Sequence, residues 1–166
     1  AATYGETLEY VMGGKVIEPL HIKSLPLVVG YSGLKADTPF YIRRVAEAFK
    51  SKKGEMEKIF KSIQTLVESA KKGLQAGDLP DVGRCMNENQ KLLVQLGVST
   101  PKLDDMIASA INAGAYGAKL SGAGGGDCMI ALIDEAKRPH VEKSIEQVGG
   151  EIIHVNVNTI GVTIES

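Results

Sequence analysis

The sequence predicts an α+β domain, and three observations support this prediction. Between residues 38 and 112, apolar residues recur at three- and four-residue steps, which is the spacing of amphipathic helices. From residue 117 the period changes, and residues 128–133 form a continuous apolar run typical of a buried strand. Residues 135–150 then read as a helix with a glycine exit, and residues 152–165 alternate as a strand or tight hairpin.

The first elements are expected to be strands, followed by a helix. Residues 15–20 and 25–31 are short β-prone runs separated by turn-like segments. A helix then begins near Thr38, which can act as its cap, because Pro39 suits the first helical position. The lysines and the glycine of segment 50–54 are expected to end this helix. Its apolar stripe consists of Ile42, Val45 and Phe49.

Three further helices are predicted before the strand-rich tail. The second carries the clearest stripe in the chain, and the segment AGDLPD (76–81) separates it from the third. The fourth begins at residues 99–105, with Ser99 or Thr100 as its cap and acidic residues in its first turn. The stripe of the second helix consists of Met56, Ile59, Phe60, Ile63, Val67, Ala70 and Leu74.

The composition narrows the class of protein. With 166 residues, 43% hydrophobic residues and a net charge of −1, the chain has the length and composition expected of one soluble domain. The near-neutral charge argues against nucleic-acid binding, and no apolar run is long enough to span a membrane. Cys85 and Cys128, without a secretory leader, favour a reducing, cytoplasmic setting. Together with His21, His140 and His154 they lack zinc-ligand spacing, so we expect no metal centre.

One glycine-rich loop stands out within KLSGAGGGDCMIAL (119–132), where four glycines fall within five positions. We interpret it as lying after a helix and before a strand, whereas a dinucleotide-binding loop needs a strand before it and a helix after it. No Lys-Ser/Thr pair follows the glycines, so the Walker pattern is also missing. Such a run can form a nest of N–H groups for an anion, or it can be a connector or a close packing contact. Each glycine lowers the stability of the folded chain by roughly 0.5–1 kcal/mol relative to alanine, because the unfolded backbone is freer. Four such residues in an apolar neighbourhood therefore favour a backbone geometry that requires glycine over a merely flexible connector.

Longer stretches of the sequence resemble one family. GAYGAKLSGAGGGDCMIALI (114–133) resembles the third signature motif of the GHMP kinases, which include galactokinases, homoserine kinases, mevalonate kinases and phosphomevalonate kinases. MNENQKLLVQLGVSTPKLDDMI (86–107) resembles the helix pair that precedes this motif in mevalonate kinases. PLVVGYSGLKADT (26–38) and TYGETLEYVMGG (3–14) resemble two earlier stretches of the same kinases. The archaeal-type mevalonate kinases are the most similar.

The resemblance implies a domain organisation. Residues 38–166 would form the ferredoxin-like GHMP kinase C-terminal domain, an antiparallel sheet with helices. Residues 1–37 would be strands that belong to the N-terminal half, which is similar to ribosomal protein S5 domain 2. The family's G-L-G-S-S phosphate loop does not occur in the sequence, and its catalytic aspartate would fall before Ala1. We therefore expect the C-terminal half of a kinase, inactive as an isolated fragment.

The resemblance also implies a site. In the intact kinases, ATP with Mg²⁺ phosphorylates a substrate hydroxyl, here that of mevalonate, between the two halves. Lys35 and Thr38 would lie near the substrate. The alternative interpretations are that Lys35 is a surface lysine and that Thr38 is a helix cap. Asp127 is expected to cap local N–H groups rather than to bind Mg²⁺. The ATP- and substrate-binding loop would consist of Ser121, Gly122, Ala123, Gly124, Gly125, Gly126 and Asp127.

Other interpretations stay open at this point. Asp127 stands where many mevalonate kinases carry a further glycine, and GAGGGDC also occurs in phosphomevalonate kinases, so that enzyme or another GHMP kinase is an alternative. A non-catalytic ferredoxin-like module that binds a small ligand or a partner is a second one. Asn89 interrupts an apolar helix stripe, and we favour a structural role for it over a place in a cleft. The expected partners are the N-terminal half and a second copy of the chain, because extended segments in residues 1–31 leave unpaired strand edges.

Overall fold

The computed structural model describes residues 5, 7–11, 13–22 and 25–155. They fall into two compact units: residues 26–154 form one, and the described residues before residue 26 belong to the other. The strand at residues 27–31 is part of the sheet of the larger unit. The predicted division of the kinase at residue 37 stays a prediction.

The smaller unit contains one antiparallel hairpin. β1 (Leu8–Val11) pairs with β2 (Val16–Pro19), with Tyr10 opposite Ile17. The predicted strand at residues 15–20 is therefore confirmed, and its partner β1 lies in the stretch that sequence reasoning described only as extended.

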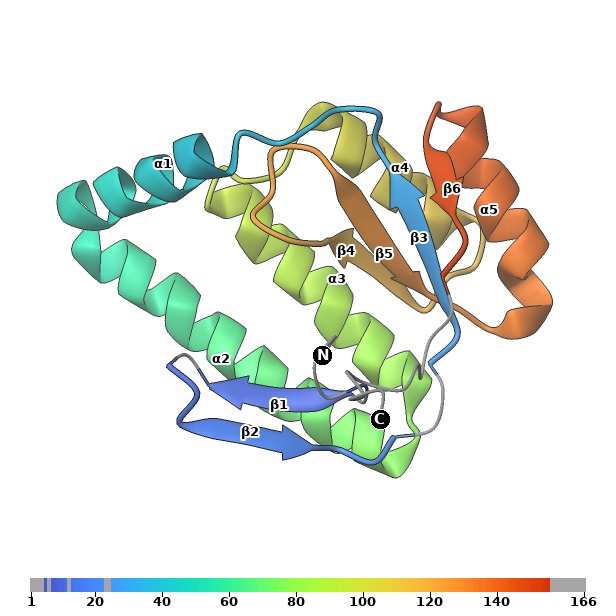
Figure 1. Ribbon diagram of the computed structural model, residues 1–166, viewed down its shortest axis with the longest axis horizontal. Coiled ribbons are helices and arrows are strands. Elements are labelled where there is room, and N and C mark those ends of the chain that lie inside the picture. Colours follow the sequence, from blue (N-terminus) through green and yellow to red (C-terminus); the bar gives the residue numbers. More distant parts are fainter. Residues whose placement is uncertain (1–4, 6, 12, 23–24, 156–166) are drawn as a thin grey trace, which may run out of the picture. The chain divides into compact units, whose positions relative to one another are not determined.

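The larger unit is built on a four-stranded antiparallel sheet (Figure 1). Its strands are β3 (Leu27–Tyr31), β4 (Gly117–Leu120), β5 (Cys128–Leu132) and β6 (Glu151–Ile153), in the order β4-β5-β3-β6. Val29 of β3 lies between Ile130 on one side and Ile153 on the other. The predicted strands at 25–31 and 128–133 are confirmed. The predicted strand or hairpin at 152–165 begins as β6, and its part beyond residue 155 lies outside the described residues.

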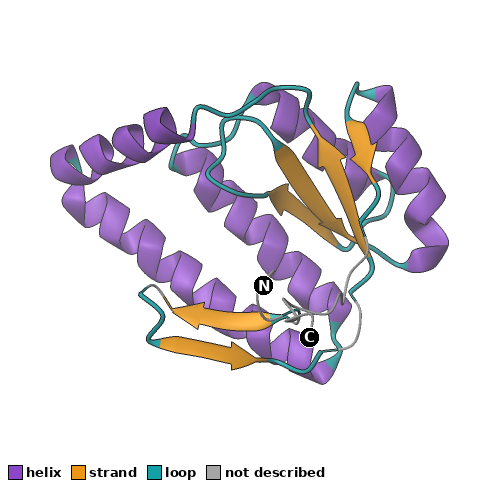
Figure 2. Cartoon of the chain, in the orientation of Figure 1, coloured by secondary structure: helices purple, strands orange, loops and turns teal. Residues whose placement is uncertain are grey.

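The helices, purple in Figure 2, follow the predicted order along the chain. They are α1 (Thr38–Ser51), α2 (Lys53–Ala76), α3 (Leu79–Gln95), α4 (Pro101–Asn112) and α5 (Arg138–Gln147), with a 3-10 turn at Glu135–Lys137. Thr100 caps α4 by accepting a hydrogen bond from the Leu103 N–H at 3.3 Å, as predicted for one of two candidates. Within the described ranges, no helix combines the length and the apolar character needed to cross a membrane.

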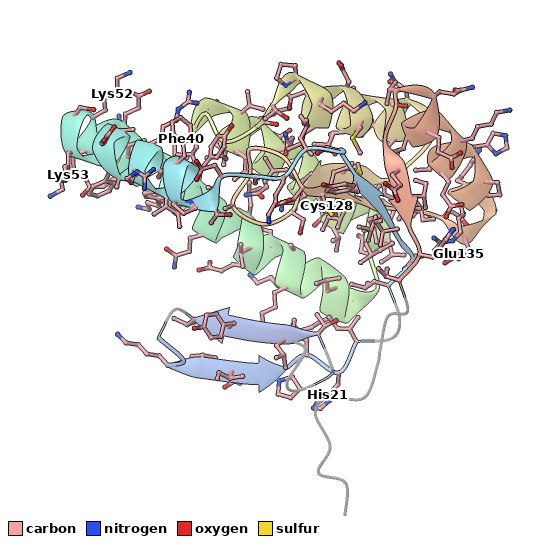
Figure 3. All side chains as sticks on the ribbon, turned by 45° about the horizontal axis from the view of Figure 1, so that its top comes forward. His21, Phe40, Lys52, Lys53, Cys128 and Glu135 are labelled. Carbon is pink, nitrogen blue, oxygen red and sulfur yellow. The ribbon has the colours of Figure 1, made fainter. Side chains whose placement is uncertain are left out.

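Two details of α1 differ from the prediction. Its cap is Asp37 rather than Thr38, because the Asp37 carboxylate accepts a hydrogen bond from the Phe40 N–H at 3.0 Å. At its other end, the chain turns at Lys52, whose backbone leaves the helical region, and Lys53 already begins α2 (Figure 3). Gly54 therefore lies inside α2 and does not form the turn between the helices.

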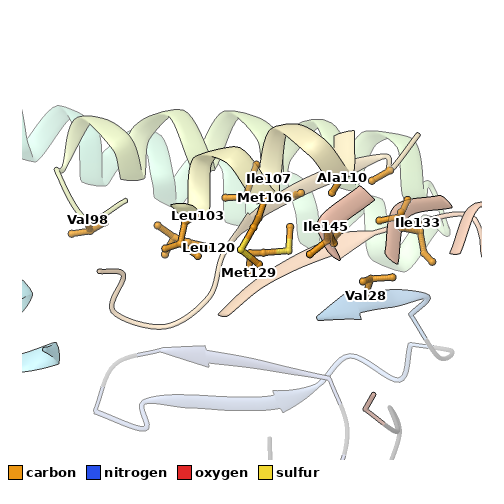
Figure 4. Packing of buried hydrophobic residues seen from close by; sticks show 14 of the residues in the cluster. Val28, Val98, Leu103, Met106, Ile107, Ala110, Leu120, Met129, Ile133 and Ile145 are labelled. Carbon is orange, nitrogen blue, oxygen red and sulfur yellow. The ribbon is translucent and has the colours of Figure 1, made fainter. Parts of the chain in front are cut away.

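One face of the sheet carries the core (Figure 4). Met106 of α4 and Ile145 of α5 approach Gly30 in the central strand so closely that a Cβ there would lie 2.9 Å from Met106 Cε. Glycine at this position lets both helices pack directly on the sheet. The largest fully buried side chains are Val28, Leu103, Met106, Leu120, Met129, Leu132, Ile133, Val141 and Ile145. The core therefore fixes β4 and β5, the two strands that hold the glycine-rich loop.

Candidate functional site

The glycine-rich loop, residues 121–127, is a hairpin loop. It joins β4 to β5, and the Ser121 N–H closes it by donating to the Cys128 carbonyl at 2.9 Å. The prediction that the loop directly follows a helix is wrong, since β4 lies between α4 and the loop. β4 has only four residues, Gly-Ala-Lys-Leu, and none is β-branched or aromatic, so the sequence carries little strand signal there.

The second half of the loop, residues 124–127, is held by two other segments, and we call it the loop base. The Gly125 N–H donates to the Val98 carbonyl at 2.8 Å, in the turn between α3 and α4. The Asp127 N–H donates to the Leu34 carbonyl at 2.7 Å, and the Asp127 carbonyl accepts from the Ser32 N–H at 2.8 Å. The loop base therefore bridges the turn before α4 and the segment before α1.

Close packing explains two of the glycines in the loop base. Gly124 has a φ of +81°, and a Cβ on it would overlap the Val98 carbonyl oxygen. Gly125 has a φ of +83°, and a Cβ on it would overlap the ring of Tyr41 in the first turns of α1. Both positions combine a left-handed backbone with a neighbouring group in direct contact, so only glycine fits without rearrangement.

The first half of the loop, residues 121–123, is different, and we call it the loop tip. Gly122 and Ala123 are exposed, and Ser121 is half-buried. A Cβ built on Gly122 would meet no atom within 4 Å. The loop tip is thus the part of the loop whose backbone is open to a ligand.

The remaining predicted site residues lie around the loop base. Asp127 has a φ of +54°, and its carboxylate accepts a hydrogen bond from the Ala36 N–H at 3.4 Å, which agrees with the predicted role as a local cap. Lys35 is exposed beside Leu34, whose carbonyl the loop base binds, and Thr38 is exposed at the start of α1. Figure 3 marks Phe40 in that first turn and Cys128 where the loop enters β5.

Possible metal-ligating side chains are scattered over the part of the chain that the structure describes. Among them, no group of three or more His, Cys, Asp or Glu side chains could hold a metal ion. His140 lies on α5 and His154 follows β6, and neither element is part of the loop.

The two thiols of the chain are both free. Burial raises the pKa of the Cys85 thiol, and burial together with the charge of Asp127 raises the pKa of the Cys128 thiol. Both therefore stay protonated at neutral pH, and neither is activated as a nucleophile.

Two amide side chains of α3 hold β4, the strand that leads into the loop. Asn87 accepts a hydrogen bond from the Ala118 N–H at 2.9 Å and donates to the Tyr116 carbonyl at 3.3 Å. Gln90 accepts one from the Leu120 N–H at 3.0 Å. These amides satisfy the outer edge of β4 in place of another strand. Sequence reasoning singled out Asn89 and missed both, although two amides three residues apart on one helix face are a usable signal.

Gln90 also reaches the turn that holds the loop base. Its amide donates to Ser99 Oγ at 3.0 Å and to Asp104 at 3.2 Å, and Ser99 Oγ donates to Asp104 at 2.6 Å. Ser99 follows Val98, whose carbonyl binds Gly125. One buried side chain thus ties β4 to the turn on the other side of the loop.

Comparison with known proteins shows where this architecture occurs. Residues 70–150, which include β4, β5 and the whole loop, match the family model described as GHMP kinases C terminal. This part of the chain is a GHMP kinase C-terminal domain. The resemblance stated from the motifs is therefore confirmed, as is the predicted α+β fold with an antiparallel sheet.

Curated relatives of the GHMP domain are archaeal mevalonate kinases. The chain is 39% identical to mevalonate kinase from Thermococcus gammatolerans over 154 residues, which is 89% of the chain and 46% of that protein. It is 38% identical to the Pyrococcus horikoshii enzyme over 161 residues, or 94% of the chain and 48% of that protein. The chain spans about half the length of the curated relatives it matches.

A solved structure agrees with these relatives. The crystal structure of L. major mevalonate kinase in complex with R-mevalonate superposes with a TM-score of 0.79 at 29% identity. The match covers 84% of this chain and 44% of the L. major chain. The fold of the GHMP domain described above is thus also that of part of a solved mevalonate kinase.

Proposed function

We propose that this chain supplies the C-terminal half of an ATP-dependent kinase that phosphorylates the hydroxyl of mevalonate. The observation that carries the proposal is the 38–39% identity to archaeal mevalonate kinases over about nine tenths of the chain, together with the GHMP domain at residues 70–150. The proposal places the protein in isoprenoid precursor synthesis and, given its two free thiols, in the cytoplasm.

In this proposal the loop tip works through its backbone. Phosphoryl transfer needs mainly positioning and stabilisation of charge on the phosphate oxygens. The Ser121 N–H is used in closing the hairpin, so the exposed Gly122 and Ala123 supply the N–H donors for such oxygens, and Ala123 borders the substrate. Because the loop base is hydrogen-bonded on both sides, these donors are held in place before any ligand arrives.

The residues before α1 complete the proposed substrate side. Lys35 supplies positive charge within the segment to which the loop base is bonded, and Thr38 supplies a hydroxyl group at the start of α1. Asp127 caps the Ala36 N–H and stays out of the chemistry. We assign no Mg²⁺ ligand within this chain and derive no step through the ion.

Phosphomevalonate is the alternative substrate, because of Asp127 in the sequence GAGGGDC. The two substrates differ at the reacting end, because mevalonate presents a free primary hydroxyl there and phosphomevalonate carries a phosphate on the same oxygen. A direct comparison of turnover therefore distinguishes them. The alternative outside the kinases is a non-catalytic module that binds a small ligand or a partner.

One assay distinguishes the three hypotheses, namely a mevalonate kinase, a phosphomevalonate kinase and a non-catalytic module. The protein encoded by the complete coding sequence is incubated with ATP, Mg²⁺ and either mevalonate or phosphomevalonate, and ADP release is followed by a coupled assay. We expect kcat/KM for mevalonate to exceed that for phosphomevalonate at least tenfold, and the 166-residue chain alone to give no turnover above background. Preference for phosphomevalonate, turnover by the isolated chain, or no phosphoryl transfer by the complete protein would each contradict the proposal.

A further inference from the structure

A second candidate binding site lies beside β4, among residues that the proposed kinase reaction does not use. It is a pocket of about 250 Å³ between α2, α3 and β4. Its walls are mostly apolar, and one lysine and one asparagine are its hydrogen-bonding side chains. The lining residues are Ile63, Leu66, Val67, Ala70, Cys85, Met86, Asn89 and Lys119.

Lys119 is an unusual residue for such a wall. In β4 it alternates with the buried core residues Ala118 and Leu120, so its side chain lies on the sheet face opposite the core. Its ammonium donates one hydrogen bond, to the Leu120 carbonyl at 2.6 Å. Among the described residues it forms no ion pair, and burial lowers its pKa. Lys119 is half-buried, and its ammonium keeps two further N–H donors beside the hydrogen bond to Leu120.

Asn89 faces the same pocket and was already anomalous in the sequence, because it interrupts an apolar stripe. Its neighbours Asn87 and Gln90 hold β4, whereas no hydrogen bond of the Asn89 amide to another described residue is formed. The lining contains no carboxylate, and the Cys85 thiol is kept neutral by burial. Nothing in the lining therefore neutralises the ammonium.

We propose that this pocket binds a small organic anion with an apolar tail, whose carboxylate or phosphate head pairs with Lys119 and accepts from the Asn89 amide. The tail would lie along Ile63, Leu66 and Val67 of α2. The volume is slightly below the usual range of ligand pockets, about 300–1,000 Å³, so it suits a short chain rather than a nucleotide. The site is independent of the proposed kinase activity and can be tested on this chain alone.

The first test compares probes that share a tail or a charge. ¹H–¹⁵N NMR spectra of the 166-residue chain are recorded during titration with hexanoate, hexyl phosphate, hexanol and acetate. We expect hexanoate or hexyl phosphate to shift the Asn89 and Lys119 signals and to bind at least tenfold more tightly than hexanol or acetate; the stronger of the two identifies the head group. Equal binding of hexanol would mean an apolar groove only. No binding of either anion would leave Lys119 as a cap of the Leu120 carbonyl, and both results would overturn the proposal.

The second test separates charge from packing. Lys119→Met should abolish the preference for hexanoate over hexanol, whereas Lys119→Arg should keep it. Lys91→Met is the matched control, because Lys91 is an exposed lysine of α3 that pairs with Glu88 outside the pocket, and it should bind hexanoate normally. In the unmodified chain, hexanoate should also raise the pKa of Lys119, followed through its side-chain signals, since an anion favours the charged ammonium. An unchanged Lys119 pKa at saturating hexanoate would contradict the proposal without any variant.

Discussion

The two halves of the glycine-rich loop use glycine for different reasons. In the loop base, Gly124 and Gly125 are required by Val98 and Tyr41, which occupy the space where a side chain would be. In the loop tip, Gly122 has no such neighbour and is exposed. A motif that looks uniform in sequence therefore combines a packed anchor with an open backbone surface. Loss of activity on changing a glycine of the loop base would not show that it contacts a ligand.

The anchor has a chemical consequence for the loop tip. A donor surface that is ordered before the reaction does not have to reorganise when charge develops, and this preorganisation is the main source of electrostatic catalysis. The loop base is bonded to two segments that are both continuous with helices, α1 and α4. The position of the loop tip is thus set by the packing of the domain.

The largest effect is expected for Gly124→Val. The left-handed backbone disfavours a β-branched residue, and the new side chain would overlap the Val98 carbonyl. We expect the free energy of unfolding, measured by urea denaturation, to fall by about 3 kcal/mol. Gly122→Val is the control, with a similar φ of +86° but open space, and it should cost about 1–2 kcal/mol. Equal losses in the two variants would remove the distinction between loop base and loop tip.

A double-mutant cycle tests the contact between Tyr41 and Gly125. Gly125→Ala should cost about 2 kcal/mol in the unmodified chain, from strain and overlap with the ring. In a Tyr41→Ala background the added methyl group has room, so the same change should cost about 1 kcal/mol less. The unfolding free energies of the four proteins give this coupling. A coupling near zero would mean that the ring does not hold the loop base in solution.

Much of this architecture could be predicted from the sequence, because helix stripes and buried strands are local patterns. The run at residues 128–133 and the stripe of α2 identify their elements without knowledge of the fold. β4 was not predicted, because it is stabilised by β5 and by Asn87 and Gln90 rather than by β-forming residues of its own. The cap of α1 was misplaced by one residue, since Asp37 and Thr38 are both capable and only the backbone decides.

The division of the loop could not be derived from sequence at all. It depends on Val98, which is 26 residues before Gly124 in the chain, and on Tyr41 and Leu34, which are farther away. Such contacts carry no periodic signal. The family resemblance identified the loop correctly as a motif but assigned all seven of its residues to ligand binding, and that assignment stays a prediction.

The loop tip is tested by turnover rather than by stability. Gly122→Ala in the complete protein adds one methyl group at a positive φ and should move the exposed N–H groups. We expect kcat/KM for mevalonate to fall at least tenfold, which corresponds to about 1.4 kcal/mol of transition-state stabilisation. Urea denaturation of the same variant should show a loss of about 1 kcal/mol. Unchanged kinetics for ATP and mevalonate would mean that the loop tip does not contact the reacting groups.

The smallest effect is expected for Asp127→Gly at the end of the loop base. Asp127 has a φ of +54°, so glycine would relieve backbone strain of about 1 kcal/mol. The change would also remove the long hydrogen bond to the Ala36 N–H and give the unfolded chain more freedom. These two losses together lower the stability by about 1 kcal/mol, which offsets the gain from the relieved strain. We therefore expect the free energy of unfolding to change by less than about 0.5 kcal/mol. Asp127→Ala loses the same hydrogen bond but keeps the backbone strain. It should therefore be the less stable of the two variants. If Asp127→Gly instead lost as much stability as Gly124→Val, the carboxylate of Asp127 would be a principal anchor of the loop base.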